Sequence, residues 1–288
     1  MADRHTLRTD TIAATIDAQG AELVSLQATG GREMIWQAGP EWPRHAPILF
    51  PIVGRLAGDT LRVGGRSYPM GQHGFARDSL FGWGERAPTH CRLVLRDSDA
   101  TRAVYPYGFR LEVAYAVSHS TVLVTLHVTN SGEVVLPASI GAHPAFAWPL
   151  APDVDKAAHT LVFAAEEPAP VRRIDRGLLR AEPATSPIRG RTLHLDPALF
   201  ADDAIVLDHP VSHTVTYSAP GAAGLSMSWS ALPWLGLWSR PRADFLCIEP
   251  WAGHASPVGF DGDIMEKPGM MHIPPHGSRI ASFCMTLK

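Results

Sequence analysis

The chain has 288 residues, of which 45% are hydrophobic and 18% are charged, and its formal net charge is −3. This composition is typical of a soluble globular protein with a sizeable core, and it excludes a basic surface for nucleic acid or an acidic tail for a tethered partner. The 25 prolines and 25 glycines indicate many turns, which favours short strands over long helices.

The cysteines and the N-terminus restrict the class of protein further. Cys91, Cys247 and Cys284 have no paired spacing, which argues against a disulfide framework and against a zinc knuckle. Cys91 and Cys247 lie in apolar, strand-like runs, so we expect them to be small buried side chains. The N-terminus has no apolar leader, and no window reaches the length of a membrane span. These features predict a cytoplasmic protein that does not enter a membrane.

The first third of the chain is predicted to form short strands separated by glycine turns. Strands are expected at residues 12–16 and 23–26, parted by the turn at Gly20. Residues 61–63 and 67–68 flank Gly64-Gly65-Arg66, which is typical of a hairpin because glycine supplies the positive φ of a tight turn.

The middle of the chain has the clearest alternation of apolar and small or polar residues. Apolar side chains occupy every second position from Leu111 to Val117 and from Val122 to Val128, and residues 118–121 between them are polar. One apolar face on each segment predicts two neighbouring strands of a half-buried antiparallel sheet.

The second half predicts a long excursion followed by further strands. Residues 151–191 are rich in Pro, Ala and Arg, with one short strand at 161–163, and Asp196 is expected to cap a helical turn that begins at Pro197. Further strands are expected at residues 204–207, 213–217, 225–229, 245–248 and 281–287. Many short strands without a long helix, repeat or linker predict one all-β sandwich domain over residues 1–288.

One stretch, residues 139–146, combines small residues with a single histidine. Gly141 and Ala142 remove side-chain bulk beside His143, and Pro144 restricts His143 to an extended backbone. A core histidine satisfied by its neighbours is an equally simple interpretation. Three other stretches with polar residues that a core does not need favour a site: 54–55, 72–78 and 247–251.

Glu249 is the carboxylate that such a site would use. It follows the apolar run 245–248 and precedes Pro250, which cannot donate to a sheet ladder, so we expect it at the end of a strand. Partial burial there would raise the pKa of its carboxyl group toward the range of a general base. The alternative is a surface glutamate where a strand ends.

Four of these segments together resemble the aldose 1-epimerase (galactose mutarotase) family. They are residues 47–56 (PILFPIVGRL), 73–75 (HGF), 141–144 (GAHP) and 248–251 (IEPW), and the resemblance runs from about Gly20 to the C-terminus. It implies a large antiparallel β-sandwich of the galactose mutarotase-like type with few short helices. It also implies a sugar site in a groove across one sheet.

The resemblance assigns roles to individual residues. Glu249 would take the proton from the C1 hydroxyl and His143 would protonate the ring oxygen, facing each other across a bound pyranose. Arg55, His73 and an aspartate, for which we choose Asp203 over Asp202, would hold sugar hydroxyls. A structural salt bridge is the alternative for Arg55, and a structural histidine in a glycine turn is the alternative for His73.

Other polar and aromatic residues are weaker candidates. We expect Arg77 to form an internal ion pair with Asp78, which ranks it below Arg55 as a substrate-binding residue. The aromatic candidates for stacking on a sugar are Trp36, Phe75, Trp148, Trp234 and Trp251, of which only Trp251 adjoins Glu249 and is retained.

The 14 histidines show no metal-binding spacing with supporting ligands. His209 and His213 are four residues apart, but Pro210 and a strand-like run spoil a helical face. We therefore predict no metal, and the implied chemistry uses no cofactor.

The sequence predicts an enzyme that interconverts the α and β anomers of a free hexose, with the sugar as its only predicted partner. One alternative is an enzyme for a hexose 6-phosphate, with Arg55 and Arg77 on the phosphate. Another is a carbohydrate-binding module without turnover, although a binder needs no acid–base pair. Neither the identity of the sugar nor the oligomeric state follows from the sequence.

Overall fold

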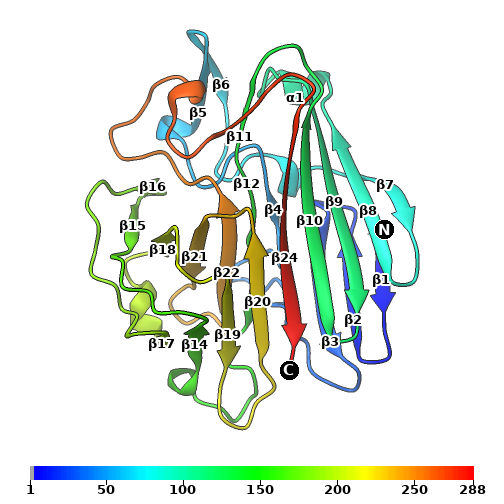
Figure 1. Ribbon diagram of the computed structural model, residues 1–288, viewed down its shortest axis with the longest axis vertical. Helices are drawn as coiled ribbons and strands as arrows, with labels where there is room; N and C mark the ends of the chain where they lie inside the picture. Colours follow the sequence, from blue (N-terminus) through cyan, green and yellow to red (C-terminus); the bar gives the residue numbers. More distant parts are fainter. Residues whose placement is uncertain (1–2) are drawn as a thin grey trace.

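The computed structural model describes residues 3–288 and contains two large antiparallel sheets (Figure 1). The first has nine strands, in the order β17 (Thr192–His194), β14 (Thr160–Phe163), β19 (Thr214–Ser218), β20 (Leu225–Ser230), β24 (Ser278–Leu287), β10 (Thr121–Asn130), β9 (Phe109–Ser118), β8 (His90–Arg96) and β7 (Gly82–Arg86). The second has the order β16 (Leu178–Leu179), β15 (Arg172–Asp175), β18 (Ile205–Asp208), β21 (Trp234–Trp238), β22 (Phe245–Ala252), β12 (Ile140–Ala142) and β4 (Ile48–Leu49), with β13 (Ala145–Ala147) also on β22.

Smaller ribbons and a few helical turns complete the fold. The ribbons are β1 (Arg4–Arg8), β2 (Ile12–Asp17) and β3 (Glu22–Ala28); β5 (Thr60–Val63) and β6 (Arg66–Pro69); and β11 (Leu136–Ala138) and β23 (Met271–Ile273). Within residues 3–288 the helical elements are α1 (Asp99–Arg102) and the 3-10 turns η1 (Ala57–Asp59), η2 (Ala76–Asp78), η3 (Lys156–Ala158), η4 (Pro197–Phe200) and η5 (Ile264–Glu266). The predicted all-β sandwich with few short helices is confirmed.

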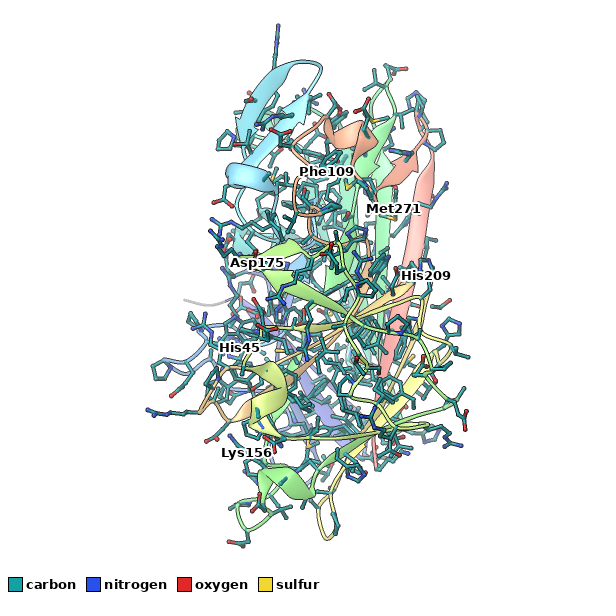
Figure 2. All side chains as sticks on the ribbon, turned by 90° about the vertical axis from the view of Figure 1, so that its left-hand side faces the viewer. His45, Phe109, Lys156, Asp175, His209 and Met271 are labelled. Carbon is teal, nitrogen blue, oxygen red and sulfur yellow. The ribbon has the colours of Figure 1, made fainter. Side chains whose placement is uncertain are left out.

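Alternation along β9 and β10 explains how the sheets meet. Val113 and Val117 of β9 and Val122 and Leu126 of β10 are buried, whereas Thr125 between them is only half-buried. The buried side chains belong to one large core that also includes residues of the eight-stranded sheet. The edge of that sheet with β15 lies on the left of Figure 1 and faces the reader in Figure 2, where Asp175 is labelled.

Local signals predicted several elements well. The hairpin β5–β6 turns at Gly64 and Gly65, whose φ angles are 53° and 77°, and Asp196 caps η4 by accepting a hydrogen bond from the Ala198 N–H. The number of strands in the segment 151–191 was underestimated, because β15 and β16 follow the one strand predicted there. Strand β21 was also missed because it is apolar on both faces and carries Gly236 at its centre.

The prediction that a strand ends at Glu249 is wrong. Strand β22 continues through Pro250 to Ala252, so Glu249 lies in mid-strand. The N–H of Ile248 donates to the Pro144 carbonyl. Because backbone groups two residues apart point to the same side of a strand, the Pro250 nitrogen faces the same neighbour, close to the break between β12 and β13. Its missing donor therefore costs little.

The structure tests the expectations for the three cysteines. Cys91 and Cys247 are buried in β8 and β22, as predicted, and Cys284 is a half-buried free thiol. No helix within residues 3–288 has the length and apolarity needed to cross a bilayer.

Candidate active site

A cleft of about 450 Å³ lies on the outer face of the eight-stranded sheet. Its floor includes Val206 of β18, Trp238 of β21, and Glu249 and Trp251 of β22. Loops contribute the walls, with Trp42, Gln72, His73, Arg77 and Arg240 among them. The resemblance implied a groove across one sheet, and the cleft lies in such a place.

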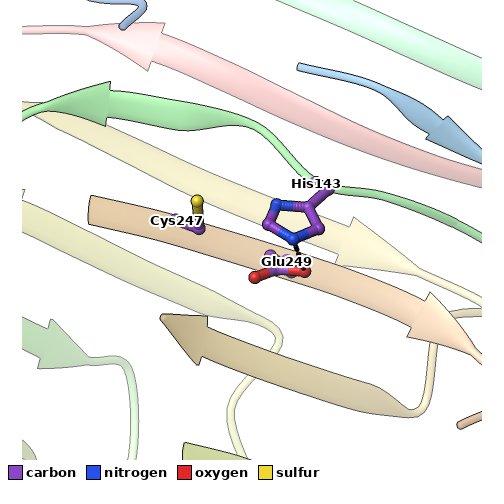
Figure 3. Close-up of side chains that lie close together, drawn as sticks. All are labelled: His143, Cys247 and Glu249. Carbon is purple, nitrogen blue, oxygen red and sulfur yellow. Dashed lines mark ion pairs between the residues drawn. The ribbon is translucent and has the colours of Figure 1, made fainter. Parts of the chain in front are cut away.

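His143 and Glu249 come together because two short strands pair with β22 in one register. Gly141 of β12 pairs with Trp251, and Ala145 of β13 pairs with Cys247. The same register across the break places His143 opposite Glu249. Nε2 of His143 lies 3.2 Å from Oε2 of Glu249 (Figure 3).

Both side chains are buried and only partly satisfied. His143 is 7% exposed and Glu249 is 1% exposed. Among the described residues, Nδ1 of His143 and Oε2 of Glu249 have no hydrogen-bond partner. Because buried polar atoms in native proteins normally have partners, these two atoms indicate a place for a ligand.

The expectation that the two residues face each other across a pyranose is wrong. A sugar ring does not fit between atoms 3.2 Å apart, so His143 and Glu249 approach a ligand from the same wall of the cleft. This arrangement suits the chemistry, because the ring oxygen and the C1 hydroxyl are attached to the same carbon atom.

Burial shifts the two titrations in opposite directions. Desolvation, and then the charge of Asp203, raise the pKa of Glu249 well above its ordinary value. Desolvation, and then the charge of Arg77, lower the pKa of His143 to about 3. Together these shifts favour the uncharged pair, with one proton on the carboxyl group.

Two tryptophans that the sequence analysis did not single out surround His143. The Trp42 ring stacks on the imidazole with centroids 4.8 Å apart, and the Trp238 ring meets it edge-on at 5.6 Å. Trp238 alternates with Gly236 and Trp234 on β21, so recognising that strand would have revealed it. Trp42 lies in a loop where no pattern marks it.

Trp251 forms part of the floor because two glycines leave room for its indole. A Cβ atom on Gly236 would lie 2.3 Å from the Trp251 ring, and one on Gly141 would lie 2.6 Å from it. The ring therefore lies flat across the neighbouring strands. Its Nε1 is buried without a hydrogen-bond partner among the described residues, which leaves a donor near Glu249.

The other aromatic candidates do not line this cleft. Trp36 packs on Phe245, Phe75 packs in the core against Phe50, Trp148 is buried, and Trp234 lies in a neighbouring hollow.

His73 lines the cleft close to His143. Its ring centroid lies 5.5 Å from that of His143, and its Nδ1 accepts a hydrogen bond from the Gly54 N–H at 3.1 Å. Burial, and then the neighbouring His143, lower the pKa of His73 well below its ordinary value. A neutral ring that accepts at Nδ1 carries its proton on Nε2, where it serves as a donor to a ligand.

Arg55 lies beside the cleft rather than in its lining. It forms a hydrogen-bonded ion pair with Asp59, and its side chain packs against Gly177, which does line the cleft. This contact is the structural salt bridge named as the alternative. The fork of donors is occupied by Asp59.

Arg77 does line the cleft, and the expected pair with Asp78 is weak. Asp78 accepts a hydrogen bond from Arg44 at 2.8 Å, whereas Nε of Arg77 is 3.8 Å from it. That Nε is buried without a hydrogen-bond partner in the described chain. Burial, and then the charge of Arg44, lower the pKa of Arg77 to about 10.

The structure separates the two neighbouring aspartates. Asp203 lines the cleft, and its Oδ1 accepts a hydrogen bond from the Ala204 N–H at 2.7 Å. Asp202 pairs with Arg180 at 3.2 Å and is absent from the lining. Our choice of Asp203 as the inward-facing residue agrees with this placement.

The buried histidines should make the protein sensitive to mild acid. Burial lowers the pKa of His73, of His143 and of His254, the last to about 4. Below the ordinary pKa of about 6.5 the unfolded chain binds protons that the folded chain does not. We therefore expect the free energy of unfolding to fall as pH drops from 7 to 5.5, with the contribution of each histidine approaching a limit of about 1.4 kcal/mol per pH unit only once pH lies below its ordinary pKa.

Denaturant titrations at several pH values would measure this effect. His143→Asn should reduce the dependence of the free energy of unfolding on pH, because it removes one of these buried histidines. A free energy of unfolding that stays constant over this range would contradict the expectation.

Comparisons with known proteins show what the whole chain is similar to. The family model described as aldose 1-epimerase matches residues 3–267. The chain is 31% identical to the chromosomal protein LacX of Lactococcus lactis over 294 residues, covering 98% of each. It superimposes with a TM-score of 0.90 on a galactose mutarotase related enzyme from Lactobacillus acidophilus, at 30% identity over 99% of this chain and 97% of that one. A galactose mutarotase-like protein from Lactobacillus casei gives a TM-score of 0.92, at 27% identity over 99% and 100%.

Proposed function

This chain belongs to the aldose 1-epimerase family. On that premise we propose that it interconverts the α and β anomers of an aldose, and the first candidate substrate is a free hexose. The observation that supports this proposal best is the pair of His143 and Glu249. The two side chains meet at 3.2 Å, are buried at the floor of a cleft, and leave two polar atoms without partners. A binding protein has no need of such a proton-exchanging pair.

The reaction moves one proton off the sugar and one proton onto it. Glu249 takes the proton of the C1 hydroxyl while His143 delivers a proton to the ring oxygen, and the bond from C1 to the ring oxygen breaks. The aldehyde turns about the C1–C2 bond. On ring closure the two residues return to their starting protonation states.

The environment of the pair fits this cycle. Ring opening converts a charged pair, carboxylate and imidazolium, into an uncharged one. Burial favours the uncharged pair, as the raised pKa of Glu249 and the lowered pKa of His143 indicate. The cleft thereby stabilises the state of the pair that exists together with the open-chain aldehyde.

Other lining residues would position the ring. Trp251 offers a flat apolar surface for the C–H face of a pyranose. His73, as a donor at Nε2, and Asp203, as an acceptor, would bind hydroxyls. Because hydrogen bonds with charged groups contribute about 1.5–3 kcal/mol each, loss of Asp203 should mainly weaken binding.

Arg77 gives a specific reason to consider a phosphorylated sugar. Asp78 is engaged by Arg44, and Arg77 lines the cleft with an unsatisfied Nε, although its Nη2 donates to the Gln72 carbonyl at 2.6 Å. Arg240 also lines the cleft, and the raised pKa of Glu249 reduces the negative charge of the lining. The second candidate substrate is therefore a hexose 6-phosphate, held by Arg77.

Polarimetry on freshly dissolved α-hexoses and their 6-phosphates tests both candidates. We expect catalysed mutarotation of free hexoses, and Arg77→Gln should reduce kcat/KM for these sugars by about 10-fold, through the loss of one charged hydrogen bond. If Arg77 binds phosphate, the 6-phosphate should be the better substrate, and kcat/KM for it should fall by about 100-fold or more in Arg77→Gln.

Arg240→Gln is the matched control, since it removes a second guanidinium from the same lining. An equal loss for both sugar classes in Arg77→Gln would exclude phosphate recognition by Arg77. Tight sugar binding without turnover of any sugar would instead identify a carbohydrate-binding module.

A further inference from the structure

Cys247 places a third metal-binding side chain beside the acid–base pair. Because it is two residues before Glu249 on β22, its side chain lies on the same face of the strand. The register that sets His143 opposite Glu249 also pairs Cys247 with Ala145, whose small side chain leaves the sulfur close to the imidazole. Figure 3 shows the three side chains close together.

We propose that His143, Cys247 and Glu249 form a binding site for a thiophilic divalent metal ion of the Zn²⁺ or Cd²⁺ class, and that its occupation blocks the acid–base pair. One donor atom from each residue lies within 4.8 Å of the other two. A tetrahedral zinc site holds its ligand atoms about 3–4 Å apart, so small side-chain rotations complete it.

Two observations point to a ligand at this place. His143 and Glu249 are more than nine-tenths buried, and Nδ1 of the first and Oε2 of the second have no hydrogen-bond partner in the described chain. The carboxylate oxygen has lone pairs that a cation would accept, and Nδ1 has one when the ring proton is on Nε2. The metal-free site leaves both of them desolvated and unused.

The set of donors selects the kind of ion. One sulfur, one nitrogen and one carboxylate oxygen are typical ligands of zinc, whereas Mg²⁺ and Ca²⁺ prefer six or more oxygen ligands. The sulfur lies in an apolar cluster with Trp42, Ala145, Ala243 and Phe245, which offers no further oxygen ligands. We therefore infer that this site binds thiophilic ions such as Zn²⁺ and Cd²⁺ in preference to Mg²⁺ and Ca²⁺.

The site is open to solvent from one side. His143 and Glu249 line the cleft, and Cys247 lies behind them, outside the lining. An ion entering through the cleft would take three protein ligands and keep a fourth position for water. As the metal–sulfur bond forms, the thiol proton is released to solvent.

Occupation of this site by a metal ion should inhibit mutarotation, because the ion would use the lone pairs of His143 and Glu249 that proton transfer requires. Cys247 itself takes no part in the proposed reaction. Removing its sulfur should therefore separate metal sensitivity from catalysis.

Cd²⁺ titration of the full-length protein tests the site through the ultraviolet charge-transfer absorption of a cadmium–thiolate bond. The band should appear at one ion per chain in the unmodified protein and in Cys91→Ala/Cys284→Ala, which keeps only Cys247. It should be absent in Cys247→Ala. Half-inhibition of mutarotation should need at least about 100-fold more Cd²⁺ or Zn²⁺ in that variant, because losing a direct ligand costs more than the 10–100-fold typical of an outer partner.

The absorption readout does not depend on any sugar, so it distinguishes a failure of the metal site from a failure of the proposed function. A band that survives in Cys247→Ala, or that disappears in the double variant, would overturn the proposal. If Cys247→Ala does not fold, His143→Asn provides the test: Cd²⁺ affinity should fall by a similar factor, and unchanged affinity would refute the site.

Discussion

Glu249→Gln should lower the rate of catalysed mutarotation by about 10²–10⁴-fold while sugar binding is retained. The amide keeps the shape of the side chain but cannot take the proton of the C1 hydroxyl. The side chain is 1% exposed and the Trp251 indole lies beside it, so water cannot easily replace the lost base. Polarimetric rates and calorimetric binding of the same sugar would separate the two effects.

Glu112→Gln is a suitable control, because this buried glutamate lies on β9 of the other sheet and pairs with Arg92 and Arg110. It should reduce stability and leave the rate unchanged. As pH rises above the ordinary pKa of a glutamate, the Glu249→Gln protein should also lose less stability than the unmodified protein. The raised pKa of Glu249 means that folding opposes its ionisation, and this cost grows as pH rises above the ordinary pKa of a glutamate and is complete once pH has passed the folded-state pKa. A near-normal rate in Glu249→Gln would remove Glu249 from the chemistry.

The fold could be predicted where one strand face is buried and the other is not. Strands β9 and β10 show this alternation along their length, so their existence and their pairing followed from the sequence. Nearly every residue of strand β21 is buried, so its sequence shows no alternation of apolar and polar residues. Pro250 was misinterpreted because the effect of a missing donor depends on which neighbouring strand it would face, and only the tertiary structure determines that.

The site was predictable in its residue types and much less in its arrangement. His143 and Glu249 were selected because a histidine among small residues and a carboxylate after an apolar strand are unusual. Their distance depends on the register of two short strands against β22, which no local pattern specifies. Arg55 has equally suggestive surroundings in the sequence, yet Asp59, four residues later, forms an ion pair with it. The cluster with Cys247 has the same origin in strand register.

His143→Asn should likewise reduce mutarotation by about 10²–10⁴-fold. Asparagine fits the same space beside Trp42 but cannot exchange a proton. In the unmodified protein the Trp42 ring, with its centroid 4.8 Å from that of the imidazole, holds His143 in one orientation. His159→Asn is the control: that histidine is fully buried and accepts a hydrogen bond from the Leu150 N–H, so its loss should reduce stability without changing the chemistry.

The pH profile of the rate would distinguish a catalytic His143 from a merely structural one. The active pair holds one proton, and it gains a second only as pH falls toward the pKa of His143, about 3. It loses its only proton as pH rises through the raised pKa of Glu249. The unmodified enzyme should therefore show a broad bell whose limbs belong to the coupled pair. In His143→Asn only Glu249 of the pair still titrates, so the residual activity should lose the limb that belongs to His143. A full bell in the variant, or a rate close to normal, would mean that another residue supplies the acid.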